Sequence, residues 1–113
     1  MTRVAGIGCR AGTTRDALAA ALAAAGGADA LATIAQRAEQ LRPLAVLLNL
    51  PLHIVDVAGI ATPTRSTRIE ALYGTGSVAE AAALAAGGPG ARLSAPRRVS
   101  ACGLVTIAIA EVP

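Results

Sequence analysis

Short apolar runs and segments of helical periodicity alternate along this 113-residue chain. The apolar runs are bounded by glycine, proline or polar residues and are short, which is typical of buried strands. Five strands are predicted, at residues 4–9, 31–35, 52–57, 92–94 and 104–110. The run at 52–57 is interrupted only by His53 and Asp56, and we expect this strand to be buried as well.

Four helices are predicted between these strands, because each helical segment ends at a glycine or a proline. The segments are residues 13–25, 38–49, 67–73 and 78–86. Three of them open with a capping box, in which a hydroxyl residue and an acidic residue three positions later satisfy free N–H groups of the first turn. The capping pairs are Thr13 with Asp16, Thr67 with Glu70, and Ser77 with Glu80.

The alternation of strands and helices defines the expected fold class. Neighbouring parallel strands need crossover connections, and intervening helices supply them. We therefore predict an α/β protein, a three-layer α/β/α sandwich with a largely parallel or mixed sheet of about five strands. The length suits a single domain spanning residues 1–113. The order of elements does not by itself indicate a function, because one fold hosts many functions.

Arginine supplies all ten basic side chains, and lysine is absent. This excludes Schiff-base catalysis and any phosphate-binding loop that depends on lysine. Arginine binds carboxylate or phosphate through a planar two-point contact, so the net charge of +3 indicates an anionic ligand. A GC-rich genome is the competing explanation, since such codon usage favours arginine as well as the nearly thirty alanines.

Metal, cofactor and membrane chemistry are not expected. Cys9 and Cys102 are not at metal-ligand spacing, and we expect both thiols to be reduced. His53 has no partner at ligand spacing, so we predict neither a metal site nor a cofactor. The uncharged runs 17–28 and 99–110 are shorter than the roughly 20 residues that cross a bilayer, and no secretory signal is recognisable, so we expect a cytoplasmic protein.

A glycine-rich turn at residues 6–14 joins the first predicted strand to the first helix. Backbone N–H groups and the helix dipole at such a turn can hold an anion. The candidate ligand-binding residues here are Gly6, Gly8, Arg10, Thr13 and Thr14. Two alternatives stay open: dinucleotide binding, although the glycine spacing is one residue wider than G-x-G-x-x-G, and a purely conformational role for the glycines.

A second glycine turn precedes the last predicted helix, where free backbone N–H groups and the helix dipole can likewise hold an anion. Its candidate ligand-binding residues are Gly74, Thr75, Gly76 and Ser77. Together the two turns can clamp one ligand. Glu80 is the acid–base candidate beside this turn, and the alternative is that its carboxylate reaches back to the backbone of the turn as part of the capping box.

Cys9 and Arg97 complete the candidate site. Cys9 lies beside Arg10 in a glycine loop and is a candidate nucleophile, with burial of an inert thiol as the alternative. Arg97 forms a basic pair with Arg98 after Pro96, and it either contacts the anion or belongs to a solvated loop. No aromatic residues interleave with the arginines, so nucleic-acid binding is not expected.

Four sequence blocks together resemble one known family. They are G-I-G-C-R at residues 6–10, L-P-L at 50–52, T-G-S-V-A-E-A-A-A at 75–83 and V-T-I-A-I-A at 105–110. In order and spacing, over nearly the whole chain, they are similar to the CobE/CbiG C-terminal family of cobalamin (corrin ring) biosynthesis. The resemblance implies a small α/β domain that handles a precorrin-type tetrapyrrole.

The resemblance also implies a ligand and a set of roles. Precorrins carry acetate and propionate carboxylates, which suit arginines and helix N-termini. Proteins of the CbiG type open a lactone and carry further regions, whereas this chain resembles the stand-alone CobE-like form. Three roles stay open: an enzyme that assists lactone opening or ring contraction, a carrier of an intermediate, and a non-catalytic docking module for a corrin-pathway methyltransferase. Neither nucleic acid nor a membrane is expected as a partner.

Overall fold

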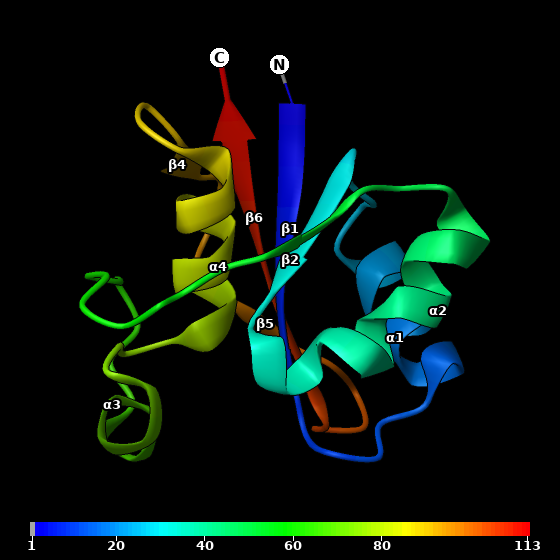
Figure 1. Ribbon diagram of the computed structural model, residues 1–113, viewed down its shortest axis with the longest axis horizontal. Helices are drawn as coiled ribbons and strands as arrows, with labels where there is room; N and C mark the ends of the chain where they lie inside the picture. The colour runs from blue at the N-terminus through cyan, green and yellow to red at the C-terminus, as the bar shows by residue number, and fades with distance from the viewer. Residues whose placement is uncertain (1) are drawn as a thin grey trace.

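The computed structural model describes residues 2–113 (Figure 1). In chain order its elements are β1 (Thr2–Cys9), α1 (Arg15–Ala24), β2 (Ala30–Thr33), a short 3₁₀ helix η1 (Ala35–Arg37), α2 (Ala38–Leu48), β3 (Leu52–Ile54), α3 (Thr67–Tyr73), α4 (Val78–Gly87), β4 (Arg92–Leu93), β5 (Arg98–Val99) and β6 (Val105–Val112). Every predicted helix and strand is present, although several bounds differ. The short strand β5 is an addition that the apolar pattern did not indicate.

The strands form one mixed sheet with the order β3-β2-β1-β6-β4, and β5 also pairs with β6. Strands β1, β2 and β3 run parallel, because helices α1 and α2 form the crossovers between them. Strand β6 instead runs antiparallel to β1, and β4 and β5 run antiparallel to β6. Short connections without helices join the strands after α4, and such connections favour antiparallel pairing. The sheet is therefore of the mixed kind that the prediction allowed.

Strands β1 and β6 are the longest and lie side by side in the sheet. Their register pairs Thr2 with Val112 at one end and Cys9 with Val105 at the other. The two chain termini therefore lie together at one end of the sheet, as Figure 1 shows. The loops that follow β1 and precede β6 lie at the opposite end, which holds the candidate site.

Helices α1 and α2 cover one face of the sheet with large aliphatic side chains. Leu18 of α1 and Leu41 and Leu44 of α2 are fully buried in the same core as Ile7 of β1 and Ile107 of β6. Side chains of a strand alternate between the two faces, so every second residue of β1 contributes to this core. We call this side of the sheet the leucine face.

Helix α4 covers the other face with small side chains, and α3 lies on the same side (Figure 1). A Cβ atom on Gly6 of β1 would lie 1.9 Å from the carbonyl oxygen of Ala79 and 2.5 Å from the amide nitrogen of Ala83. Glycine at position 6 is thus required for the close approach of α4 to β1. We call this side the alanine face. Helices on both faces confirm the predicted three-layer sandwich.

Two helices begin one residue away from the predicted cap. Thr14 rather than Thr13 caps α1, because the Thr13 hydroxyl donates a 2.7 Å hydrogen bond to the carbonyl of Arg10 instead. Ser66 rather than Thr67 caps α3. In both places two neighbouring hydroxyl residues compete for the cap, and the fold beyond the helix selects between them.

Strand β3 is shorter and more exposed than the apolar pattern predicts. It ends at Ile54, and both His53 and Ile54 are exposed. The prediction of a buried strand over residues 52–57 is therefore wrong. The physical reason is position: β3 lies at the edge of the sheet, and an apolar run does not distinguish an edge strand from a central one.

Candidate functional site: an arginine-lined cleft

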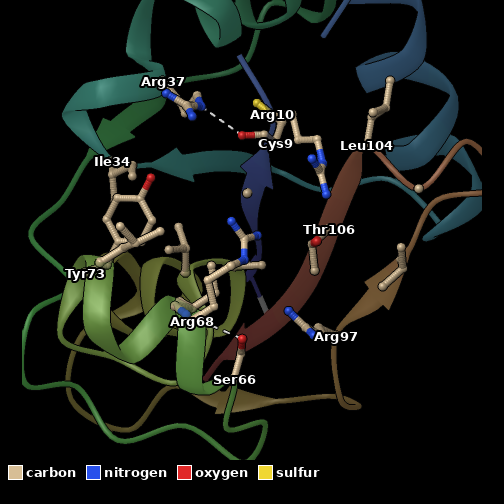
Figure 2. Close-up of a pocket in the computed structure, with 17 residues that line it drawn as sticks. Cys9, Arg10, Ile34, Arg37, Ser66, Arg68, Tyr73, Arg97, Leu104 and Thr106 are labelled. Carbon is tan, nitrogen blue, oxygen red and sulfur yellow. Dashed lines mark hydrogen bonds between the residues drawn. The ribbon is translucent and has the colours of Figure 1, made fainter. Parts of the chain in front are cut away.

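A cleft of about 290 Å³ lies at the end of the sheet where β1 finishes and α4 begins (Figure 2). Its lining includes Gly8 of β1 and Thr106 of β6, which are opposite each other in the sheet. Helix α3 lies on one side, and the segment that contains Arg97 and Leu104 lies on another. Gly8 adds no side chain here, so the strand leaves this space open.

Four arginines from four different segments line the cleft. They are Arg10 after β1, Arg37 at the end of η1, Arg68 in the first turn of α3 and Arg97 before β5. Figure 2 shows the side chains of Arg10, Arg68 and Arg97 directed into the cleft. Across residues 2–113, no ion pair engages these three guanidinium groups, and no aspartate or glutamate lines the cleft. Three like charges that share one space favour a ligand with more than one acidic group.

The backbone that carries Arg10 is fixed by contacts on several sides. Its amide donates a 3.1 Å hydrogen bond to the carbonyl of Leu104, and its own carbonyl accepts from the Thr13 hydroxyl. Arg37 differs from the other three arginines, because its Nε donates a 2.8 Å hydrogen bond to the carbonyl of Cys9. Arg37 thus stabilises the end of β1, and Arg10 extends from an ordered turn.

The remaining lining of the cleft is largely apolar. Ile34 and Tyr73 line it at one side, as Figure 2 shows. At the rim, Leu72 is 60% exposed and Val99 is 58% exposed, and Leu104 is also exposed. Large exposed aliphatic side chains around a polar cavity are typical of ligand-binding surfaces. The cleft therefore combines cationic groups with an apolar rim.

Glu80 lies behind the cleft wall, in the first turn of α4, and is fully buried. Its amide donates to the hydroxyl of Ser77, which caps α4 as predicted. Its carboxylate does not return to the backbone of the glycine turn. Instead it accepts hydrogen bonds from the amide and hydroxyl of Thr64 and from the amide of Arg97. The predicted capping box is therefore correct in one respect, because Ser77 caps α4. It is wrong in the other, because the carboxylate of Glu80 does not bind the backbone of the turn.

The thiol of Cys9 is half-buried and packs against the core of the leucine face. Burial raises the pKa of this thiol, and the nearby charge of Arg37 lowers the pKa by a smaller amount. The protonated thiol is therefore favoured over the nucleophilic thiolate. This environment favours the inert-thiol alternative for Cys9.

The second glycine turn lines a separate cavity of about 400 Å³. The residues of the turn that line it are Gly74, Thr75 and Gly76. The hydroxyl of Thr75 donates a 2.6 Å hydrogen bond to the carbonyl of Ile60, and a Cβ on Gly76 would lie 2.4 Å from the carbonyl oxygen of Thr64. These residues hold the loop before α3, and only the start of α4 beyond the turn reaches the arginine-lined cleft.

The cleft brings together four of the residues that the sequence indicated: Gly8, Cys9, Arg10 and Arg97. Gly6 lies under α4, while Thr13 and Thr14 are engaged within the turn before α1. Arg37 and Arg68, which also line the cleft, were not predicted as site residues from the sequence. One signal was available, because Arg37 closely follows the carboxyl end of a predicted parallel strand, and ligands of α/β sheets bind at such ends.

Among residues 2–113, no group of three histidine, cysteine or acidic side chains is arranged to hold a metal ion. No helix of this part of the chain has both the length and the apolar character to cross a membrane.

The fold and the cleft define a small α/β sandwich domain with a cationic site at the carboxyl end of its first strand. Residues 3–110 match the model of a family described as cobalamin synthesis G C-terminus. The chain therefore belongs to this family of cobalamin biosynthesis proteins, as the sequence blocks near Gly8 and Glu80 indicated.

Solved structures agree with this assignment. CobE, a protein from the cobalamin (vitamin B12) biosynthetic pathway, is 33% identical, with a TM-score of 0.80 over 99% of this chain and 91% of CobE. The cobalamin biosynthesis protein chiG of Agrobacterium tumefaciens is 44% identical, with a TM-score of 0.76 over 97% of this chain and 98% of chiG. No curated protein sequence matches the chain.

Proposed function

We propose that this protein binds a polycarboxylated tetrapyrrole of the cobalamin pathway in the arginine-lined cleft. The observation that carries the proposal is the convergence of Arg10, Arg68 and Arg97, whose guanidinium groups have no acidic partner among residues 2–113. A guanidinium group matches a carboxylate in shape and charge and binds it through two parallel hydrogen bonds.

The apolar part of the cleft supports the same ligand class. Precorrin-type intermediates combine a largely apolar macrocycle with acetate and propionate groups at its edge. The exposed side chains of Leu72, Val99 and Leu104 form an apolar rim beside the arginines. The rim is suited to contact the face of the ring while the arginines bind its edge.

The size of the cleft indicates how much of the ligand it encloses. Pockets that surround a drug-sized ligand have volumes of roughly 300–1,000 Å³. The volume here, about 290 Å³, is just below that range. The cleft therefore holds one edge of a tetrapyrrole with its carboxylates, and the rest of the ring lies over the rim.

A carrier role is favoured over catalysis by the two candidate catalytic residues themselves. The thiol of Cys9 has a raised pKa, and the carboxylate of Glu80 is buried outside the lining of the cleft, where Thr64 and the backbone amide of Arg97 bind it. Neither group is prepared to attack or to move a proton on a ligand in the cleft. Help with lactone opening or ring contraction is the enzymatic alternative, which a turnover assay with a precorrin lactone tests.

A titration monitored by absorbance tests the proposal, with hydrogenobyrinic acid as the metal-free polycarboxylated corrinoid. Replacing Arg68 by Gln removes charge-assisted hydrogen bonds worth about 1.5–3 kcal/mol, so Kd is expected to rise roughly tenfold to a hundredfold. Arg42→Gln is the matched control, because Arg42 pairs with Glu39 on the exposed side of α2. The absence of any spectral change with hydrogenobyrinic acid and with precorrin intermediates would contradict the proposal.

A docking module for a pathway enzyme is the second candidate function. It is supported by the outer side of α2, where Val46 is 81% exposed and Leu47 is 54% exposed. Co-purification with a corrin-pathway methyltransferase, together with a negative ligand titration, would favour this candidate. In that case Val46→Ser is expected to weaken the association, and Arg68→Gln is expected to leave it unchanged.

A further inference from the structure

We propose that Glu80 is a positioning residue that sets the geometry of the ligand-binding arginines without touching the ligand. Its carboxylate joins two loops that are distant in sequence, one leading to Arg68 and the other carrying Arg97. The proposal rests on the proposed function, because it assigns Glu80 to the binding of the same ligand.

The carboxylate of Glu80 uses both of its oxygens, and both are inaccessible to solvent. Oε1 accepts a 2.9 Å hydrogen bond from the amide of Thr64. Oε2 accepts from the hydroxyl of Thr64 at 3.1 Å and from the amide of Arg97 at 3.0 Å. One side chain on α4 thus fixes the backbone on two sides of the cleft.

Two further hydrogen bonds lie between the Thr64 loop and the start of α3, the helix that carries Arg68. Two residues after Thr64, the amide of Ser66 donates to the carbonyl of Gly76 at 2.9 Å. The hydroxyl of Ser66 then caps α3 by accepting from the amide of Ile69. Arg68 lies in the first turn of this helix, so Glu80 and Gly76 together hold the loop that leads into α3 and to Arg68.

The contact with Arg97 is more direct. The hydrogen bond to Glu80 is made by the amide of Arg97 itself, which leaves the guanidinium group free for the cleft. The neighbouring strand β5 has only two residues, Arg98 and Val99. Without Glu80, the loop before β5 would lose this link to α4.

A carboxylate is the group that this position requires. All three neighbours are donors, and an ionised carboxylate only accepts hydrogen bonds. A glutamine has the same size but would turn its NH₂ group toward one of these donors. The location in the first turn of α4 also suits a negative charge, because the N-terminal end of the helix dipole is positive. A buried carboxylate without a cationic partner is costly, and here the donors and the dipole offset that cost.

The test combines Glu80→Gln with hydrogen exchange and ligand titration. We expect far-ultraviolet circular dichroism like that of the wild type, amides of Thr64 and Arg97 that exchange at least tenfold faster, and a roughly tenfold higher Kd for hydrogenobyrinic acid. Glu39→Gln is the matched control, because Glu39 pairs with Arg42 on the exposed side of α2 and does not line the cleft. Its Kd is expected to equal that of the wild type.

A double-mutant cycle separates positioning from general destabilisation. If Glu80 acts through the arginines, the effect of Glu80→Gln on Kd disappears when Arg68 and Arg97 are both replaced by Gln. An undiminished effect in that background overturns the proposal. Thr64→Val is the second variant if Glu80→Gln does not fold, because it removes only the hydroxyl donor; a severalfold rise in Kd is expected, and an unchanged Kd overturns the proposal.

Failure of this proposal is distinguishable from failure of the proposed function. If the wild type does not bind hydrogenobyrinic acid, the proposed function fails and this proposal fails with it. If the wild type binds and Glu80→Gln binds equally well despite faster exchange at Thr64 and Arg97, only the positioning role fails.

Discussion

Leucines fill the space between the sheet and helices α1 and α2, whereas the side chains of α4 buried against the other face are mostly alanines. A fully buried leucine contributes about 1.5–3 kcal/mol through removal of its apolar surface from water, and an alanine contributes far less. The leucine face therefore supplies most of the apolar stabilisation. The alanine face instead allows α4 to lie close to β1.

That short distance places the first turn of α4 at the cleft. Val78 and Ala79 line the cleft, and the next residue, Glu80, reaches the loops on either side of it. Larger side chains on α4 would move this turn away from β1. Stability and site geometry thus depend on opposite faces of one sheet, and substitutions on each face test that division.

The largest effect is expected from Gly6→Ala on the alanine face. The added Cβ meets backbone atoms of Ala79 and Ala83, so α4 must move as a whole. The free energy of unfolding, measured in urea, should fall by more than about 5 kcal/mol, because backbone atoms cannot yield as the side chains do in ordinary overpacking, which commonly costs roughly 1–3 kcal/mol.

Gly8→Ala is the control for this change. Its Cβ would lie 3.7 Å from Val78, an ordinary contact, so stability should change by less than about 1 kcal/mol. A Gly6→Ala protein as stable as the wild type would show that α4 does not need its close approach to β1.

An intermediate effect is expected from Leu41→Ala on the leucine face. Leu41 is fully buried, and the cavity should lower the free energy of unfolding by about 2–5 kcal/mol. Under conditions where the variant is folded, Kd for hydrogenobyrinic acid should stay as in the wild type. Leu47→Ala on the exposed side of the same helix should change stability by less than about 0.5 kcal/mol. A tenfold rise in Kd for Leu41→Ala would contradict the separation of the two faces.

The smallest effect is expected from Cys9→Ala, and it is a change in how the free energy of unfolding depends on pH. Burial raises the pKa of this thiol in the folded protein, so the folded state holds the proton more tightly than the unfolded state. The free energy of unfolding should therefore fall as pH rises from the cysteine pKa of the unfolded chain, about 8.5, to the higher value of the folded protein. Urea titrations at neutral and alkaline pH should show a smaller alkaline loss for Cys9→Ala than for the wild type.

Cys102→Ala is the control for this pH dependence. Cys102 is exposed, and the hydrogen bond with Ser100 is the main cause that lowers the pKa of its thiol. The sign is opposite to that of Cys9, so removal of Cys102 should not reduce the alkaline loss of stability. Equal alkaline losses for Cys9→Ala and the wild type would contradict the assigned environment of Cys9.

The order of elements could be predicted because hydrophobic periodicity is a local property. The cap of α1 was displaced by one residue, since Thr13 and Thr14 are both suitable and only the carbonyl of Arg10 decides between them. The exposure of His53 depends on the place of β3 in the sheet, which the apolar run does not encode.

The candidate site was predicted in part for a related reason. Arg10 lies in a recognisable turn, but its convergence with Arg68 and Arg97 is created by tertiary packing. The role of Glu80 was also assigned from local sequence, whereas Thr64 and Arg97, distant in sequence, are the donors that its carboxylate binds. Motifs thus indicated individual residues, and the fold determined which of them meet.

The pairing of β1 with β6 has a consequence for how this domain can be used as a building block. Thr2 and Val112 are opposite each other, and directly paired residues of antiparallel strands lie roughly 4.5–5.5 Å apart. A short linker could join the two ends, and new termini could be opened in a surface loop. Any polypeptide fused at either end would leave from the side remote from the arginines, so the domain is suited to modular attachment with its cleft unobstructed.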